Sequence, residues 1–234
     1  MTIRAVVFDF NGVILNDESV HCDLFQEVLE QENVRFDSQA YHEKYLGYDD
    51  RGCFANAMLD AGFSPSDEQI NEMVARKARR YLEVAEQGLP FFDRAGECLK
   101  AIAQHWPIGI NSGALRPEIE LSLSRLGVRD CVGPIISAED TLKGKPDPEG
   151  YRLAWEALQQ LPGLQSLKPE ECLVIEDSLQ GILSAKLAGM RTVGVAQTYP
   201  MDVLETSGAD ALLRTTSEFT PEWIRDTFHR EATT

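Results

Sequence analysis

Short runs of apolar, mostly β-branched residues recur along the chain and alternate with longer stretches of helical periodicity. The runs are 3–8, 108–110, 134–136, 172–175, 192–195 and 209–213, and the helical stretches are about 97–105, 116–126, 148–160 and 180–188. Continuous apolar runs of this length are typical of strands buried on both faces of a sheet. Their alternation with helices favours parallel strands joined by right-handed crossovers. The sequence therefore predicts a three-layer α/β protein with a parallel sheet.

Residues 17–85 interrupt this alternation. No strand-like run occurs there, whereas 20–29 has a helical apolar face and both 52–61 and 67–84 have helical character. An insert at this point follows the first strand, beside the sheet edge where open α/β sheets bind ligands. We therefore predict an α/β core formed by 1–16 and 86–234, with an inserted α-helical cap domain at 17–85 that serves as a lid.

Composition excludes several classes of function. The chain has 22 Lys and Arg against 38 Asp and Glu, which gives a net charge of −16. Binding to nucleic acid relies on an excess of basic residues, so none is expected. No apolar run approaches the ~20 residues of a membrane span, and no signal peptide is evident. The five cysteines are widely spaced without a CxxC pair, which is typical of reduced thiols in a cytoplasmic protein.

Polar residues suited to phosphate or metal chemistry follow several predicted strands. They are Asp9, Asn11, Gly12, Asn111, Ser112, Gly113, Lys145, Glu176 and Asp177. A hydroxyl with free backbone N–H groups suits an anionic oxygen, a lysine places a charge on phosphate, and adjacent carboxylates suit a hard cation such as Mg²⁺. Each feature alone is also explained by a turn, a helix cap or a solvated charge. Together they are more informative, because the carboxyl ends of parallel strands meet in one crevice.

The order of these residues resembles the haloacid dehalogenase-like hydrolase superfamily, in its helical-cap branch of phosphoglycolate phosphatase and β-phosphoglucomutase-like phosphatases. Asp9 to Val13 matches motif one, Ser112 motif two, Lys145 motif three and Glu176 with Asp177 motif four. The resemblance covers nearly the whole chain. It implies a Rossmann-like core and phosphoryl transfer through an aspartyl-phosphate.

The resemblance also implies a metal site and a nucleophile. Asp9 would be the nucleophile. Mg²⁺ would be held by Asp9, by the main-chain carbonyl of Asn11 and by Asp177. Glu176 would either bind the metal or support its ligands.

The remaining roles concern the phosphorylated substrate. By resemblance, Ser112 would bind a phosphoryl oxygen and Lys145 would neutralise charge between the nucleophile and the phosphate. The other residues that we expect to contact substrate are Gly12, Asn111, Gly113, His21 and Arg51. Of these, His21 and Arg51 lie in the predicted cap, where the mutases of the family place a histidine and a phosphate-binding arginine. His21 is also explained as a half-buried helix residue with one hydrogen bond, and Arg51 as an exposed charge on a helix.

Asn11 departs from the family pattern. The family's phosphatases and phosphomutases have a second Asp at this position, which protonates the leaving alcohol and then activates water. An amide cannot accept and release that proton, and the loss of a positioned acid/base typically lowers the rate by about 10²–10⁴. Three explanations for Asn11 stay open: a natural weak enzyme or regulatory phosphate-binding protein, an engineered substitution, or an Asn-Gly pair that deamidates.

We therefore predict a Mg²⁺-dependent phosphoric monoester hydrolase that acts slowly on a small phosphorylated metabolite. The alternatives are a catalytically impaired protein that binds a phosphorylated ligand or has a regulatory role, and a sugar phosphomutase. Phosphonate hydrolysis would need a Schiff-base lysine such as Lys44 or Lys77, and haloacid dehalogenation needs no metal, so both fit less well. We expect a cytoplasmic monomer or weak dimer.

Overall fold

The computed structural model describes residues 2–46 and 48–228 and divides the chain into two compact units. The core unit comprises 1–16 and 90–234, and the cap unit comprises 17–89. The sequence-based boundary between 85 and 86 lies inside helix α4 (Asp67–Gln87). The two units are described separately below.

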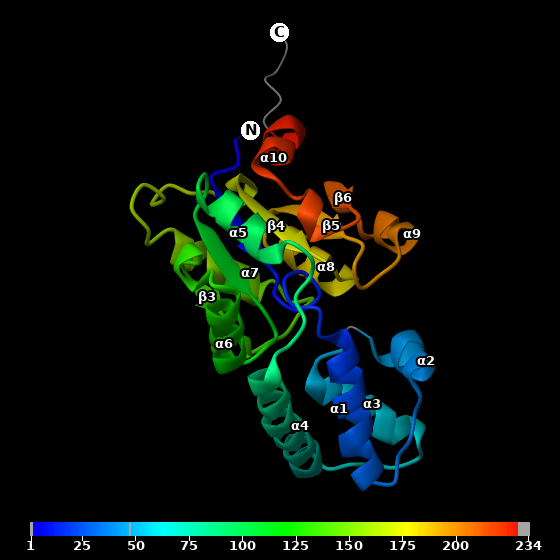
Figure 1. Ribbon diagram of the computed structural model, residues 1–234. Helices are drawn as coiled ribbons and strands as arrows, with labels where there is room; N and C mark the ends of the chain where they lie inside the picture. Colours follow the sequence, from blue (N-terminus) through cyan, green and yellow to red (C-terminus); the bar gives the residue numbers. More distant parts are fainter. Residues whose placement is uncertain (1, 47, 229–234) are drawn as a thin grey trace. The chain divides into compact units, whose positions relative to one another are not determined.

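A parallel sheet forms the centre of the core unit (Figure 1). Its strands are, in spatial order, β3 (Ile135–Ile136), β2 (Ile108–Asn111), β1 (Ala5–Phe8), β4 (Cys172–Glu176), β5 (Arg191–Val195) and β6 (Ala211–Leu213). Every neighbouring pair is parallel, and all six predicted strands are confirmed. The chain runs outward from β1 to β3 and then returns to place β4 beside β1. Ligands of such sheets bind at this reversal point.

Helices cover both faces of the sheet. The predicted ones are α5 (Ala95–Ala103), α6 (Arg116–Leu126), α7 (Glu149–Leu158) and α8 (Leu179–Leu187). On one face, α7 and α8 pack against β1 and β4 in an apolar cluster that includes Val7, Tyr151 and Val174. On the other face, Phe8 packs edge-on against Phe219, whose carbonyl accepts from the Cys98 thiol of α5. The core unit therefore has the three layers of a Rossmann-like fold.

Short helices complete the core unit. They are α9 (Met201–Leu204), α10 (Pro221–Phe228) and the 3₁₀ turns η2 (Arg129–Cys131), η3 (Ala138–Asp140), η4 (Pro169–Glu171), η5 (Glu205–Ser207) and η6 (Thr216–Glu218). None of these was predicted from the sequence. Elements this short contribute too few apolar positions to show a period.

The cap unit is helical, as predicted. It contains α1 (Glu18–Gln31), α2 (Ser38–Ala40), the π-helical turn η1 (Tyr41–Tyr45), α3 (Asp50–Asp60) and α4. Ser66 and Gln69 form a capping box that starts α4, which fixes the turn between α3 and α4. An apolar cluster that includes Phe25, Phe54 and Met73 gives this unit its own core.

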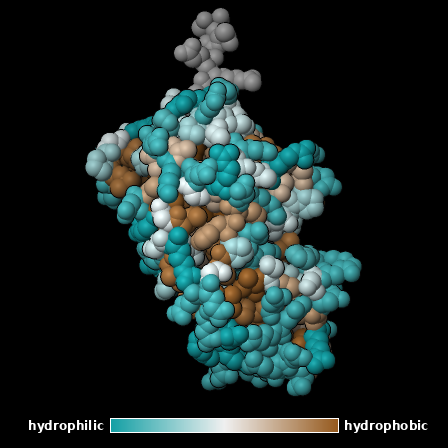
Figure 2. Space-filling model, in the orientation of Figure 1, coloured by the Kyte–Doolittle hydropathy of each residue, from teal (hydrophilic) through white to brown (hydrophobic). Residues whose placement is uncertain are grey.

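Hydrophilic residues cover most of the face drawn in Figure 2, as expected from the net charge of −16. Among the described residues, no helix combines the length and the apolar character that a membrane crossing requires. The longest helix, α4, has 21 residues and carries charged side chains along its length.

Candidate active site

Two adjacent strands deliver the acidic residues of the site. Asp9 directly follows β1, Glu176 is the last residue of β4, and Asp177 comes next. Each side chain offers an oxygen within 4.8 Å of the others, and all three residues are buried. The structure thus brings together the three predicted metal-binding carboxylates at the point where the strand order reverses.

The carboxylate cluster is electrostatically suited to a cation. Burial, with repulsion from Glu176, raises the pKa of Asp9 to about 7, although Lys145 opposes the shift. Burial, with repulsion from Glu176 and Asp9, raises the pKa of Asp177 well above its usual value. Carboxylate oxygens are the ligands that Mg²⁺ prefers, and a divalent ion offsets repulsion of this kind. The donor set therefore fits Mg²⁺.

Lys145 lies between two of these acids. Its ammonium donates to Oδ1 of Asp9 at 2.6 Å and to Oε1 of Glu176 at 2.5 Å. Burial alone would lower the pKa of Lys145, but the two carboxylates outweigh it and raise the pKa above its usual value. The side chain therefore stays charged beside the predicted nucleophile.

Glu176 accepts hydrogen bonds on both carboxylate oxygens. Besides Lys145, Oε1 accepts from the Tyr151 hydroxyl at 2.9 Å. Oε2 accepts from two consecutive backbone N–H groups at 3.0 Å and from the Ser178 hydroxyl at 2.9 Å. Gly181 leaves room for this carboxylate, because a Cβ there would lie 1.7 Å from Oε1. Tyr151 was not identified from the sequence, since a lone aromatic residue in a helix shows nothing of where its hydroxyl points.

Asn11 follows β1 and Ser112 follows the neighbouring strand β2, and their side chains contact each other. The Ser112 hydroxyl donates to Oδ1 of Asn11 at 3.2 Å. Asn111 is buried, and Gly150 makes room for it, because a Cβ at Gly150 would lie 2.2 Å from its Oδ1. A Cβ at Gly113 would meet no atom within 4 Å, so packing does not require glycine at that position.

Gly12 is a glycine for two physical reasons. Its φ of +77° lies in the left-handed region that other residues rarely adopt. In addition, a Cβ would lie 1.9 Å from Oδ2 of Asp177 and 2.9 Å from Oγ1 of Thr198. The turn after Asp9 therefore packs directly against the last acid of the site. Thr198 was not identified from the sequence.

His21 belongs to a partly buried polar cluster within the cap unit. Its Nε2 lies 3.0 Å from Oδ2 of Asp17, and its Nδ1 lies 2.8 Å from the Lys77 ammonium. Lys77 also donates to Asp50 at 2.5 Å, and Tyr81 donates to Asp17 at 2.5 Å. These contacts give both His21 and Lys77 a structural role inside the cap.

Arg51 is engaged on the surface of the cap unit. Its guanidinium donates to Asp67 and to Asn71, both at 2.5 Å, and so links α3 to the start of α4. Lys44 is exposed, with its ammonium 3.6 Å from Asp60. Both of these partners of Arg51 are cap residues.

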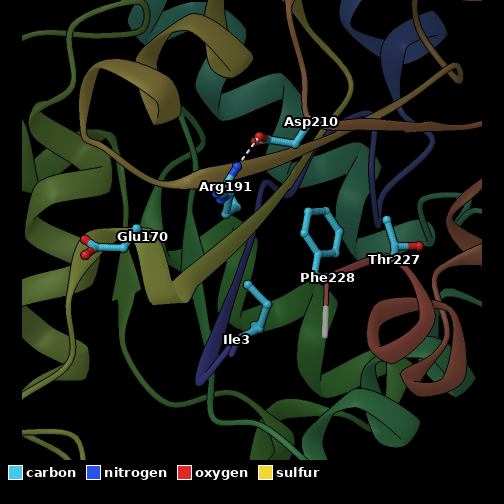
Figure 3. A pocket seen from close by; sticks show the side chains of 6 residues that line it. All are labelled: Ile3, Glu170, Arg191, Asp210, Thr227 and Phe228. Carbon is cyan, nitrogen blue, oxygen red and sulfur yellow. Dashed lines mark hydrogen bonds and ion pairs between the residues drawn. The ribbon is translucent and has the colours of Figure 1, made fainter. Parts of the chain in front are cut away.

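A separate cavity of about 420 Å³ lies in the core unit (Figure 3). It is lined by Ile3, Glu170, Arg191, Asp210, Thr227 and Phe228. Ile3 precedes β1 and Arg191 begins β5, so this cavity lies at the amino-terminal edge of the sheet. None of the predicted site residues lines it, and its Arg191 and Asp210 form an ion pair at 2.7 Å.

Comparisons with known proteins agree with this geometry. β-Phosphoglucomutase of Bacillus subtilis (strain 168) is 29% identical over 230 residues, which cover 96% of this chain and 95% of that protein. Validoxylamine A 7′-phosphate phosphatase of Streptomyces hygroscopicus subsp. limoneus is 28% identical over 216 residues, 92% of this chain and 95% of that protein. The crystal structure of β-phosphoglucomutase from Clostridium difficile has the same fold, with a TM-score of 0.82 at 20% identity over 97% of this chain and 98% of that one. A family model described as haloacid dehalogenase-like hydrolase matches residues 3–189. The chain therefore belongs to the haloacid dehalogenase-like hydrolase family.

Proposed function

We propose that the protein is a Mg²⁺-dependent phosphatase that hydrolyses a small phosphorylated metabolite through an aspartyl-phosphate on Asp9. The observation that carries the proposal is the arrangement of Asp9 and Asp177 at the adjacent ends of β1 and β4, with the Lys145 ammonium donating to Asp9. Relatives named as a phosphatase and a phosphomutase support a phosphorylated small molecule as the substrate class.

In the proposed reaction, one carboxylate oxygen of Asp9 attacks phosphorus while the bond from phosphorus to the leaving oxygen breaks. The products of this step are an aspartyl-phosphate and the alkoxide of the leaving alcohol, which requires a proton. The Lys145 ammonium, 2.6 Å from Asp9, offsets charge on the phosphoryl oxygens, and the Ser112 hydroxyl donates to one of them. Water then attacks phosphorus as the bond from phosphorus to the Asp9 oxygen breaks, which restores Asp9 and releases inorganic phosphate. The proton that the water loses balances the proton that the alkoxide takes up.

The groups that would hold Mg²⁺ are Asp9, Asp177 and the main-chain carbonyl of Asn11. When bound, Mg²⁺ would offset the negative charge on the phosphoryl oxygens in the transition state. Glu176 serves as an anchor, since its two oxygens already accept five hydrogen bonds. It holds Lys145 in place.

Asn11 makes the proposed phosphatase slow. Its amide can donate a hydrogen bond to the leaving oxygen but cannot transfer a proton to it or take one from water. Hydrolysis of alkyl phosphates, whose leaving groups need that proton, is expected to be slower by about 10²–10⁴ than with a carboxylic acid at this position.

The test compares phosphate release by the wild type and Asn11→Asp, with Mg²⁺ and with EDTA. Substrates are a panel of sugar phosphates, phosphoglycolate and nitrophenyl phosphate, whose leaving group hardly needs a proton. We expect Asn11→Asp to raise alkyl phosphate hydrolysis by about 10²–10⁴ and nitrophenyl phosphate hydrolysis far less. Asn16→Asp is the matched control, because it makes the same change at an exposed position of the core unit.

Two results would contradict the proposal. If neither protein releases phosphate from any substrate and Mg²⁺ has no effect, the protein is not a phosphatase. If the wild type and Asn11→Asp hydrolyse alkyl phosphates equally fast, Asn11 does not limit the reaction.

A second candidate function is phosphate-ligand binding without turnover, which Asn11 specifically favours. It predicts a measurable dissociation constant for a phosphorylated sugar in the presence of Mg²⁺, with no release of phosphate over hours. A phosphomutase is a weaker candidate, because it too needs the acid/base that Asn11 replaces.

A further inference from the structure

Gln197, two residues beyond the end of β5, joins segments that are far apart in the sequence. Its Nε2 donates to the carbonyl of Gly12 at 2.8 Å, and its Oε1 accepts from the backbone N–H of Thr216 at 2.7 Å. The carbonyl can only accept and the N–H can only donate, so these two partners fix the orientation of the amide. Rotating the amide by 180° would break both bonds.

Thr216 completes this arrangement from the first position of η6. The residue is 1% exposed, and its hydroxyl donates to the carbonyl of Val13 at 2.8 Å. The same hydroxyl lies 3.0 Å from Oε1 of Gln197. Two consecutive carbonyls of the turn after the nucleophile, those of Gly12 and Val13, are therefore held by two side chains from the far end of the chain.

The same loop also contacts the other side of the site. Thr198, which follows Gln197, hydrogen-bonds to the carboxylate of Asp177. Gly12 lies against that carboxylate so closely that a Cβ would come within 1.9 Å of it. Residues 197 and 198 thus contact both the turn that follows the nucleophile and the last acid of β4.

We propose that Gln197 and Thr216 are positioning residues that hold the Gly12–Val13 turn and thereby fix its separation from Asp177. The Mg²⁺ site suggested above would take its ligands from Asp9 and Asn11, which lead into this turn, and from Asp177, so a loose turn would have to be ordered each time an ion bound. The expected effect on Mg²⁺ affinity rests on the proposed function. The ordering of the turn by Gln197 and Thr216 does not.

The test uses Gln197→Met, which removes both amide bonds at nearly constant volume. The matched control is Gln159→Met, because the Gln159 amide also donates to a backbone carbonyl, at 2.9 Å, but far from the site. Amide hydrogen exchange is measured at Gly12, Ile14 and Leu15, whose N–H groups bond within the turn. We expect exchange at these amides to be on the order of tenfold faster in Gln197→Met and unchanged in the control.

Thr216 provides an independent pair of variants. Thr216→Val removes the hydroxyl and is expected to accelerate exchange in the turn. Thr216→Ser keeps the hydroxyl and is expected to exchange as slowly as the unmodified protein. Calorimetric titration with Mg²⁺ is expected to show a dissociation constant on the order of tenfold higher in Gln197→Met than in Gln159→Met, following the same loss of order.

Unchanged exchange in Gln197→Met, or an equal increase in Gln159→Met, would overturn the proposal. Faster exchange with an unchanged Mg²⁺ dissociation constant would show that order in the turn does not affect Mg²⁺ affinity, which would overturn that part of the proposal. Phosphate release by the wild type is measured in the same preparations. Faster exchange in Gln197→Met, with no phosphate release by the wild type or by Asn11→Asp and no effect of Mg²⁺, supports the hold on the turn and refutes the proposed function.

Discussion

Replacing Gly181 with alanine has two opposing effects on stability. It raises helix propensity, and it creates a steric clash within the site. Gly181 is the third residue of α8, and alanine in a helix is ordinarily more stable than glycine by about 1 kcal/mol. Here the new Cβ would lie 1.7 Å from Oε1 of Glu176, whereas ordinary contacts begin at 3.4 Å. The carboxylate must therefore move by about 1.7 Å, the difference between these two distances.

This movement breaks part of the network on Glu176. The carboxylate accepts five hydrogen bonds of 2.5–3.0 Å, and a displacement of that size takes about two donors out of range. A hydrogen bond to a charged group contributes about 1.5–3 kcal/mol. After the gain in helix propensity is subtracted, we expect Gly181→Ala to lower the free energy of unfolding by about 2–5 kcal/mol.

Urea unfolding followed by circular dichroism measures this change. The matched control is Gly96→Ala, a helical glycine of the same unit, where a Cβ would lie 3.2 Å from the tip of the flexible Leu126 side chain. That variant is expected to be unchanged or slightly stabilised. If Gly181→Ala is as stable as the wild type, the reasoning about the crowded Glu176 carboxylate is wrong.

Other consequences can be measured directly. Tyr151→Phe removes one of the hydrogen bonds to Glu176 and is expected to cost about 1.5–3 kcal/mol of unfolding free energy; an unchanged urea midpoint would contradict this. Cys131 is the one cysteine of the five that is not buried, so a thiol reagent is expected to modify it first, and peptide mass analysis showing another site labelled earlier would refute this. Deamidation at Asn11 requires attack by the following backbone nitrogen, which donates to the carbonyl of Leu15 at 2.9 Å. We expect the folded protein to keep Asn11 intact under conditions in which the urea-unfolded chain deamidates, as mass spectrometry of both samples would show.

The strands were predictable because a strand buried on both faces is apolar at most positions. Val6, Val7 and Phe8 obey this rule, and the same pattern identifies the other strands of the sheet. The helix α10 was not predicted, although its eight residues pack Ile224 into the core. A helix of eight residues, about two helical turns, contains too few apolar positions to show a helical period in the sequence.

The acids of the site were predictable because their positions at strand ends follow from the chain order, whereas Lys145, nine residues beyond β3, was predicted from the resemblance to motif three. The residues that support them were not. Gln197 lies 185 positions from Gly12, and Thr216 lies 203 from Val13. A single glutamine or threonine in a loop carries no periodic signal, and these contacts exist only because β5 and β6 extend the sheet beyond β4 in parallel register.

The arrangement of the site separates charge stabilisation from proton transfer. The hydrogen bonds that hold Lys145 and Glu176 run to Asp9, Tyr151 and Ser178, so an amide or a carboxylate at position 11 replaces none of these partners. In the proposed phosphatase, a chain with Asn11 therefore keeps the groups expected to attract a phosphate and a cation, while it lacks the proposed group that moves a proton. For the same reason, the ratio of alkyl to aryl phosphate hydrolysis isolates the step that Asn11 controls, because both substrates depend equally on Lys145 and only the alkyl ester depends on a donated proton.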